Sequence, residues 1–400
     1  MPRQYSVAEA VIVIWQFMDK DAFRLHVHNS IHAINPDDWN KLSGTENPFI
    51  QYDFLSALED GGAVGGNSGW NIAHLALYND SNELVGVAPH YLKQHSYGEY
   101  IFDHSWAEAY QRYGLNYYPK LQSAIPFTPV TGERIIISNL IKDKILKKTQ
   151  ILNNIIDETK KINVSSVHFN FIQEPSDIRK NNLNVLIRQG IQYHWKNNNY
   201  KSFDDFLKSL SSRKRKVIKK ERLCLKNNNL KVKILTGNEI EKKHIDFFYK
   251  CYTNTTGRKW GHKYLTKEFF ININKNFNEK IVLFLALNDD TMVASAINFL
   301  SSTHLYGRLW GSLYEIPYLH FELCYYQAVE YAIKNKILVV EAGAQGEHKI
   351  QRGYMPEKTW SLHWIKDQKF SFAINKYLHE EKNIMNQQKK DLEKFTPYKF

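Results

Sequence analysis

The sequence LALYND at residues 75–80 recurs as LALNDD at residues 285–290, and this repeat decides the fold. Each copy opens a predicted β-hairpin, and a third strand, a helix and a strand beside the hairpin follow it in the same order. Two short segments could agree by chance, but the matching order of elements around them favours a duplication. We therefore predict an α/β protein of two tandem modules, each built around a mixed sheet.

Alternating apolar residues and turn signals place the strands and helices of both halves. In the first half the predicted elements are strands at 24–31, 72–79, 83–93, 98–103, 164–171 and 190–197 and a helix at 140–161. In the second half they are strands at 230–236, 281–287, 291–300, 303–310, 337–343 and 359–366 and helices that begin near 203, 238 and 319. We predict that residues 1–17 are an extension outside the modules, 18–197 the first module, and 198–400 the second module with a C-terminal helix.

Length, charge and cysteine content narrow the class of protein. A chain of 400 residues exceeds what one hydrophobic core usually supports, which agrees with two modules. The net charge of +12 would favour polyanionic partners, although the abundance of Lys, Asn and Ile can also reflect a composition bias without a binding role. Cys224, Cys251 and Cys324 are widely spaced, which favours reduced thiols in a cytoplasmic protein over a disulfide framework or a zinc site. No apolar run reaches the roughly 20 residues of a membrane span.

The most polar segment of the chain is EAGAQGEHKIQRG at residues 341–353, which follows an apolar strand. Open α/β sheets bind ligands at the carboxyl ends of strands, and the glycines here allow a sharp turn and a close approach to a ligand. Glu347, His348 and Lys349 would supply a carboxylate, an imidazole and a cation within one loop. A solvated loop that happens to be charged is the alternative, and we favour a functional site because of the glycines and the apolar strand.

A second candidate region combines the strand around Arg308 with the helix that begins near 319. Arg308 lies among apolar neighbours, where an unpaired charge would be costly, so we expect it to meet an anion or a carboxylate. The first turn of the helix holds His320 and Glu322, and its free N–H groups suit phosphate or carbonyl oxygens. A capping role for His320 and a dipole-balancing role for Glu322 fit the sequence equally well.

A basic run, SRKRKVIKKER at residues 212–222, is predicted to be helical. Helical spacing would turn Phe206, Leu210 and Val217 inward and leave Arg213 and Lys220 outside. Such a helix would suit a donor that carries phosphates, such as CoA, an acyl carrier arm or tRNA, and it is equally typical of a solvated face.

Aromatic stretches with interspersed polar groups occur in the first half at 97–103, 117–120 and 126–129. They fit the wall of an organic ligand pocket, and they also fit an aromatic core or a module interface. The glycines of residues 61–66 match neither a P-loop nor a dinucleotide-binding loop. The chain has no G-x-S-x-G or H-E-x-x-H motif, which disfavours hydrolases and zinc enzymes.

Longer motifs occur at 306–311 (YGRLWG), 319–327 (LHFELCYYQ) and 341–349 (EAGAQGEHK), and further ones at 47–49 (NPF), 118–121 (YPKL) and 126–132 (PFTPVTG). Together they resemble FemAB-like proteins of the GNAT superfamily, bacterial predicted N-acyltransferases often described as peptidoglycan biosynthesis proteins. The resemblance extends from about Met18 to residue 380. It implies a tandem GNAT-like fold and acyl transfer to an amine, with Lys349 similar to the Fem-type lysine near the reacting centre.

The resemblance also bears on the donor. Fem-type enzymes use an aminoacyl-tRNA and ordinary GNAT enzymes use an acyl-CoA. The GNAT pyrophosphate loop Q/R-x-x-G-x-G/A is missing before the helix near 319, which disfavours acetyl-CoA and favours a long-chain acyl or an aminoacyl donor.

We therefore predict an enzyme that transfers an acyl or aminoacyl group from CoA, an acyl carrier protein or a tRNA to a small amine, free or linked to a lipid or cell-wall precursor. It would hold no metal and no tightly bound cofactor, and would contact a membrane at most peripherally. Lys349 or N–H groups near Gly346 would stabilise the oxyanion, Glu347 or His348 would remove the proton, and the donor would be held by Arg213 and Arg215. The predicted substrate-binding residues are Arg308, Trp310, His320, Glu322, Glu341, Gln345, Arg352, Tyr118 and Lys120.

Two other interpretations are open. The basic helix at 213–222 could make the chain a non-catalytic RNA- or membrane-surface-binding protein, which predicts binding that falls steeply with salt. The first module could also serve only as a platform for the acceptor, because no segment in it is as polar as 341–352.

Overall fold

The computed structural model describes residues 17–18, 23–176, 184–258, 263–343 and 346–399, and the chain divides into two compact units. Unit 1 consists of Met1–Gly190 and Thr359–Met385, and unit 2 of Ile191–Lys358 and Asn386–Phe400. The sequence predicted a single boundary near residue 197, whereas the structure returns Thr359–Met385 to unit 1. The physical reason is the pairing of residues 360–365 with the strand at 166–172, two segments far apart in the sequence. Local periodicity cannot predict such a pairing.

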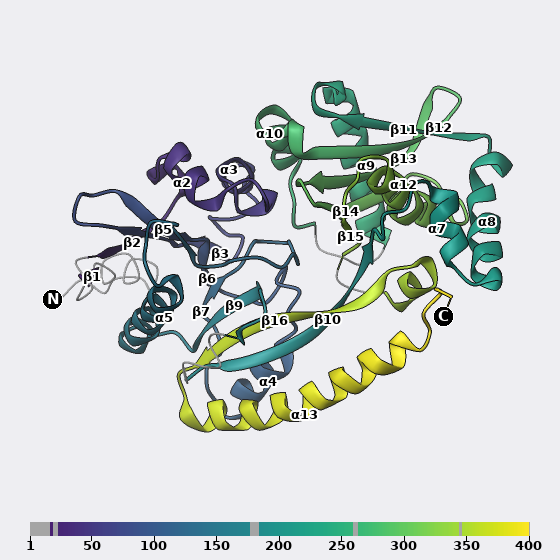
Figure 1. Cartoon of the computed structure of the whole chain (residues 1–400). Coiled ribbons are helices and arrows are strands. Elements are labelled where there is room, and N and C mark those ends of the chain that lie inside the picture. The colour runs from purple at the N-terminus through teal and green to yellow at the C-terminus, as the bar shows by residue number, and fades with distance from the viewer. Residues whose placement is uncertain (1–16, 19–22, 177–183, 259–262, 344–345, 400) are drawn as a thin grey trace. The chain divides into compact units, whose positions relative to one another are not determined.

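In its described part, unit 1 contains two sheets (Figure 1), one with the order β1-β2-β4-β5-β8 and the other with the neighbours β3-β6-β7-β9-β16. The strands are β1 (Phe17–Met18), β2 (Arg24–His28), β3 (Trp70–Ile72), β4 (His74–Tyr78), β5 (Leu84–Ala88), β6 (His90–Lys93), β7 (Lys120–Ser123), β8 (Ile136–Ile137), β9 (Ser166–Ile172) and, from Thr359 on, β16 (Met355–Ile365). The helices are α2 (Pro36–Ser43), α3 (Tyr52–Asp60), α4 (His104–Arg112), α5 (Lys144–Lys161) and the first part of α13 (Gln368–Glu393).

The main core cluster of unit 1 combines α5 with strands of both sheets, and Leu75 and Leu77 of β4 belong to it. β7 and β9 run parallel, α5 connects them, and β16 pairs antiparallel with β9. Buried side chains of α5, among them Leu152 and Ile155, cluster with Leu121 of β7 and Val167 of β9. The segment Thr359–Met385, called the tail below, adds Trp360, Leu362 and Trp364 to this core.

Unit 2 is built on the strand order β11-β12-β13-β14-β15-β10, in which β14 and β15 are parallel and the other neighbours antiparallel. The strands are, from Ile191 on, β10 (Leu186–Lys196), then β11 (Leu230–Thr236), β12 (Ile281–Asn288), β13 (Thr291–Leu300), β14 (His304–Ser312) and β15 (Val339–Glu341). The helices are α7 (Phe203–Ser209), α8 (Ser212–Asn227), α9 (Lys242–Arg258), α10 (Lys267–Asn276), α11 (Leu319–Phe321), the π-helical η5 (Glu322–Tyr326), α12 (Gln327–Lys334) and the 3₁₀ segment η6 (Glu347–Arg352).

Unit 2 has the predicted order of an antiparallel hairpin, a third strand, a helix and a last strand, with β15 parallel to β14. In unit 1 the third strand is β7, which was not predicted, and α4 and β8 also occur between the hairpin and β9. In both units the last strand lies beside the third strand and not, as predicted, beside the hairpin. Residues 1–16 of the predicted extension lie outside the described residues, whereas Phe17 and Met18 form β1 and pair with β2.

Two local predictions are wrong. Residues 98–103 form no strand, because Gly98 and Tyr100 have φ values of 78° and 56°, which an extended chain cannot adopt. Val217 is 38% exposed instead of facing inward, although Phe206 and Leu210 are fully buried as expected.

Within the described residues, no helix combines the length and the apolar character that crossing a bilayer requires.

Candidate active site

The parallel strands of unit 2 separate at a defined point. β14 and β15 pair only as far as Tyr306 opposite Glu341, where β15 ends, while β14 continues to Ser312. Gly307 lies at the separation, and a Cβ atom there would come within 3.2 Å of the carbonyl oxygen of Glu341. A pocket of about 90 Å³ lies in this opening. The carboxyl end of a parallel strand pair is where open α/β sheets bind ligands.

The pocket receives side chains from three elements. Arg308 and Trp310 come from β14 and Asn298 from β13, and the helix that begins at Leu319 supplies His320, Cys324 and Tyr325. Tyr318, in the left-handed region with φ 66°, gives this helix no side-chain cap. The segment η5 is π-helical, a distortion that is frequent at functional sites because it changes which side chains face a neighbour.

Lys349 is buried beside the end of β15. Its side chain is 3% exposed, and its Nζ donates to the carbonyl oxygen of Gly343 at 3.1 Å. Within the described part of the chain no carboxylate pairs with it. Burial lowers the pKa of Lys349 to about 8. The ammonium group is therefore charged at neutral pH but costly to keep so, which makes it a strong electrostatic donor for a developing anion.

Glu341, the last residue of β15, is also buried. Burial raises the pKa of its carboxyl group to about 8, and the charge of Arg308 opposes that rise. At neutral pH the group is therefore mainly protonated, so it can donate a hydrogen bond but is a poor base. Arg308 is half-buried and near enough to influence the charge of Glu341, and its pairing with an anion stays a prediction.

His348 and Glu347 both lie at the exposed edge of η6. The Nε2 atom of His348 is 3.0 Å from the hydroxyl of Tyr325, and burial together with the nearby charges of Arg352 and Lys349 lowers its imidazole pKa. A lowered pKa keeps the imidazole neutral at pH 7, as a proton acceptor requires. Glu347 is exposed.

Arg352 and Glu322 are each held in a buried ion pair with a residue of α8. Arg352 contacts Glu221 through two hydrogen bonds, of 2.6 and 3.1 Å, and donates to the carbonyl oxygen of His348 at 2.7 Å. Glu322 is fully buried, accepts from Arg222 at 3.0 Å and accepts from Gln327 at 2.7 Å. These contacts tie α8 to the π-helical segment and to the loop that carries Lys349. The structure therefore places both side chains as supports of the site.

The outer face of α8 carries the predicted donor contacts. Arg213 is exposed and Arg215 is half-buried, as is Arg222. Ile218, Glu221 and Cys224 form the buried face of the helix. The exposed side chains of the basic run include Arg213, Lys216, Lys219 and Lys220, together with the apolar Val217.

Tyr118 and Lys120 belong to a buried ionic cluster in unit 1. Lys120 is fully buried and donates to Glu99 at 2.8 Å and to Asp103 at 2.5 Å. Burial alone would lower the pKa of Lys120, but the two carboxylates outweigh it and hold the pKa above its ordinary value. Tyr118 is half-buried, and its hydroxyl lies 2.8 Å from that of Ser96. Of the aromatic stretches, Tyr117 and Phe127 are part of a core, whereas Tyr97 and Phe102 are about half exposed.

The same cluster extends across the second sheet of unit 1. The hydroxyl of Tyr117 donates to Asp103 at 2.7 Å and lies 3.3 Å from Nε2 of His168, whose Nδ1 is 2.6 Å from Nδ1 of His363. Lys93 adds a second buried lysine, with its Nζ atom 3.5 Å from the ring centre of Trp70. Unit 1 thus contains a buried cluster of four ionisable side chains, Lys93, Glu99, Asp103 and Lys120.

Structure and sequence can now be compared for the predicted residues. In unit 2, Arg308, Trp310 and His320 meet at one pocket, and Lys349, His348 and Glu341 lie on the loop or strand end beside it. Gln345 lies outside the described residues. Sequence reasoning missed the residues that hold the site together or lie hidden in unit 1, namely Glu221, Arg222, Cys324, Tyr325, Lys93, Glu99 and Asp103. A single acidic residue at the end of a basic run was the available signal for Glu221.

The comparisons with known proteins concern nearly the whole chain. A family model named FemAB-like and described as peptidoglycan biosynthesis/recognition matches residues 30–400. No curated protein matches the sequence.

Solved structures with a similar fold include FemX, with a TM-score of 0.52 and 12% identity over 86% of this chain and 98% of FemX. L-PGS from Bacillus licheniformis has a TM-score of 0.50 and 9% identity over 86% of this chain and 97% of its own. The C-terminal domain of a putative lysylphosphatidylglycerol synthetase from Agrobacterium fabrum has a TM-score of 0.50 and 6% identity over 84% and 95% of the two chains.

At such identities the likeness concerns the fold, and it agrees with the two GNAT-like modules that the repeat and the motifs predicted. The family match spans nearly all of the sequence. This chain therefore belongs to the FemAB-like family, as its motifs indicated.

Proposed function

We propose that the protein is an N-acyltransferase that moves an acyl or aminoacyl group from a carrier to an amine, with the reaction in unit 2. The observation that carries the proposal is the position of Lys349, a buried ammonium group beside the carboxyl end of β15 that hydrogen-bonds only a carbonyl oxygen among the described residues. Membership of the FemAB-like family supports a transferase.

In the proposed reaction the acceptor nitrogen attacks the carbonyl carbon of the donor thioester or ester. A C–N bond forms, the carbonyl oxygen gains negative charge, and the C–S or C–O bond to the carrier breaks. Lys349 stabilises the oxyanion, because a charged donor in a site of low dielectric acts strongly on charge that develops nearby. His348 accepts the amine proton and passes it to the leaving sulfur or oxygen, so the carrier leaves as a thiol or a hydroxyl; Glu347 is the second candidate for this role.

Substrate positioning in this proposal uses the opening between β14 and β15. Arg308, Trp310 and His320 line that opening and would orient the donor carbonyl. Arg213 and Arg215 on α8 would contact the phosphates of CoA, of an acyl carrier arm or of tRNA. No tightly bound cofactor is needed, because the carrier is itself a substrate.

The acceptor is proposed to be a small amine, either free or linked to a lipid or a cell-wall precursor. The family description names peptidoglycan, and the name of one structural neighbour denotes a lysyl group joined to a phospholipid. We also propose a cytoplasmic site of action with at most peripheral membrane contact, because the wide spacing of the three cysteines in the sequence favours reduced thiols.

The proposal is tested by incubating the purified protein with three donor classes, acyl-CoA of several chain lengths, acyl carrier protein thioesters and aminoacyl-tRNA, against a panel of amines. Mass spectrometry should detect an amide product from one donor class. Lys349→Met should lower its rate about 10²–10³-fold with an unchanged melting temperature. Lys334→Met, an exposed lysine on α12, is the matched control and should retain full activity.

Equal rates for Lys349→Met and the wild type would refute the assignment of the oxyanion role. An absence of product from all three donor classes, with RNA binding that falls steeply with salt, would instead support the non-catalytic alternative.

A further inference from the structure

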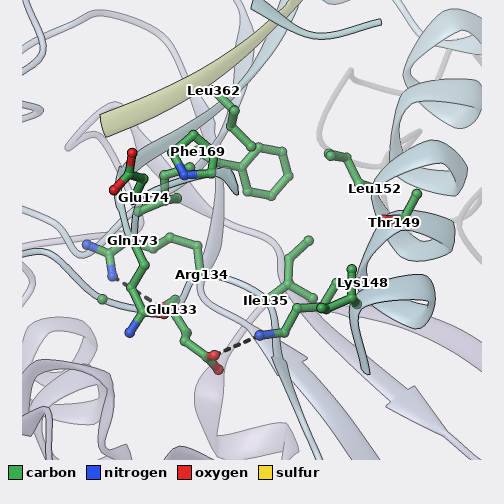
Figure 2. Close-up of a pocket in the computed structure, with 14 residues that line it drawn as sticks. Glu133, Arg134, Ile135, Lys148, Thr149, Leu152, Phe169, Gln173, Glu174 and Leu362 are labelled. Carbon is green, nitrogen blue, oxygen red and sulfur yellow. Dashed lines mark hydrogen bonds and ion pairs between the residues drawn. The ribbon is translucent and has the colours of Figure 1, made fainter. Parts of the chain in front are cut away.

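Unit 1 contains a pocket of about 150 Å³ that the proposed reaction does not use (Figure 2). It lies between the first turns of α5, the carboxyl end of β9 and the segment 132–135. Figure 2 shows Leu152 and Thr149 of α5 on one side of the pocket and Phe169 and Gln173 on another. Every lining residue belongs to unit 1.

The repeat allows the position of this pocket to be compared with that of the pocket in unit 2. In unit 1, α5 links the parallel strands β7 and β9, just as the helix from Leu319 to Lys334 links the parallel strands β14 and β15 in unit 2. The unit 1 pocket lies at the carboxyl end of β9, beside Leu362 of β16 and the segment 132–135, and none of the residues of β7 lines it. The unit 2 pocket is lined mainly by β14 and β13, so the two pockets lie at the same helix in the repeat but against different strands.

The inner wall of the pocket is hydrocarbon. Leu152, Phe169, Ile172 and Leu362 line it as buried side chains, and Ile135 and Ile145 line it nearer the surface. A cavity of roughly 150 Å³ with such a lining holds a molecule about the size of benzene. An alkyl chain of about six carbons fits that volume.

One wall supplies a buried cation. Arg134 is 2% exposed and donates to the carbonyl oxygens of Asn170, Glu133 and Val130 at 2.8, 3.2 and 2.6 Å. No carboxylate pairs with it in the described part of the chain, and burial lowers its pKa to about 9. Carbonyl oxygens satisfy three of its five N–H groups but do not balance its charge, so a buried anion would gain both hydrogen bonds and charge pairing.

The other charges at the pocket lie nearer to solvent. Lys148 and Glu133 are partly exposed and pair with each other at 2.7 Å, as Figure 2 shows, and Glu174 is exposed. The amino end of α5 adds a partial positive charge, since Asp143 provides no side-chain cap. The buried part of the pocket therefore favours an anion.

We propose that this pocket binds a small amphipathic carboxylate, with an alkyl chain of about six carbons against Phe169 and Leu152 and the carboxylate paired with Arg134. The site lies in unit 1 and does not depend on the acyl transfer proposed for unit 2. Unit 1 would then bind a ligand itself, in contrast to the interpretation in which the first module only supports the acceptor.

Isothermal titration of the full-length protein with hexanoate, hexan-1-ol and hexylamine tests the proposal. Hexanoate should bind saturably and at least about tenfold more tightly than either of the others, because only the carboxylate can pair with the guanidinium. Equal binding of hexanoate and hexan-1-ol would show a pocket without the proposed anion contact. Absence of saturable hexanoate binding to the folded wild-type protein would overturn the proposal.

Two neighbouring positions on α5 offer a matched pair of variants. Ile145 lines the pocket and is 49% exposed, whereas Leu146 is 56% exposed and does not line it. Ile145→Trp should block the pocket and abolish hexanoate binding, and Leu146→Trp should bind like the wild type, with both melting temperatures nearly unchanged. Hexanoate binding that survives Ile145→Trp would place the ligand elsewhere. Arg134→Gln, if folded by circular dichroism, should lose the preference for hexanoate over hexan-1-ol.

Discussion

Lys349 and Glu341 show how burial sets the chemistry of single residues in unit 2. Both side chains are removed from water, which disfavours the charged form of each. The lysine pKa falls and the carboxyl pKa rises, so both groups titrate near pH 8. A site with a weakly held ammonium charge and a neutral carboxylic acid has donors for an oxyanion and no strong competing anion.

The alkaline limb of the pH–rate profile should reflect the deprotonation of Lys349. Below pH 8 its ammonium group is charged and stabilises the oxyanion, and above pH 8 it loses that charge, so kcat should fall as the pH rises through about 8. An arginine keeps its charge throughout this range. Lys349→Arg should therefore lower the maximum rate, since its geometry differs, but shift the alkaline limb upward. A pH–rate profile of both proteins checks this, and identical limbs would assign the limb to another group.

The pH dependence of the free energy of unfolding should reflect the titration of Glu341. Its folded-state pKa of about 8 exceeds the ordinary value of 4.5, so the folded protein binds this proton more tightly than the unfolded chain does. The resulting stabilisation is complete below pH 4.5 and is lost as the pH rises through about 8, by at most roughly 5 kcal/mol. Glu341→Gln should remove this dependence and be more stable than the wild type at pH 9. Urea unfolding at pH 5, 7 and 9 measures it.

The exposed Glu347→Gln is the control for that experiment, because its carboxylate lies in solvent. It should follow the wild-type dependence on pH. A Glu341→Gln protein that loses stability with pH as steeply as the wild type would show that other groups dominate.

At the scale of elements, α8 explains one failure of sequence reading. A single helical phase from Phe206 through Leu210 to Val217 predicts that Val217 faces inward. The structure instead ends α7 at Ser209 and begins α8 at Ser212, and this break resets the phase, so that Ile218 is buried. Periodicity can show that a helix exists, but a two-residue interruption between polar residues leaves its phase undetermined.

The two faces of α8 should differ in what they contribute to stability. Ile218 is fully buried, so Ile218→Ala should lower the free energy of unfolding by about 2–5 kcal/mol. Val217→Ala, at the partly exposed position just before Ile218, should change the free energy of unfolding by less than about 1 kcal/mol. Chemical denaturation of both variants measures the difference. Comparable losses would mean that the helix is rotated from its described position.

The cationic face of α8 should act on the donor and not on the chemical step. Arg213→Gln together with Arg215→Gln should raise KM for the donor several-fold and leave kcat nearly unchanged, because phosphate contacts bind ground and transition states alike. Lys219→Gln together with Lys226→Gln, two exposed lysines of the same helix, is the charge-matched control. A loss of RNA or vesicle binding without any effect on KM would favour the binding-protein interpretation.

At the scale of the whole molecule, the sequence predicted the repeat and most strands because each depends on local pattern. It could not predict that Lys93, Glu99, Asp103 and Lys120 are buried together, since charged residues are read as exposed unless a partner is known. It also could not predict which unit receives the tail. Both failures concern contacts between residues far apart in the chain, which periodicity does not encode.

The returning tail should be indispensable for unit 1. Residues 359–385 supply Trp360, Leu362 and Trp364 to its main core and Ile374 and Leu378 to a second cluster. Loss of buried side chains of this size costs roughly 2–5 kcal/mol each, and a domain has only about 5–15 kcal/mol in total. A fragment of residues 1–190 should therefore lack near-UV circular dichroism and a cooperative thermal transition. The same fragment joined through a Gly/Ser linker to residues 359–385 should regain both, because the linker restores β16 beside β9. A cooperative transition in the fragment 1–190 alone would show that residues 359–385 are not required for unit 1 to fold.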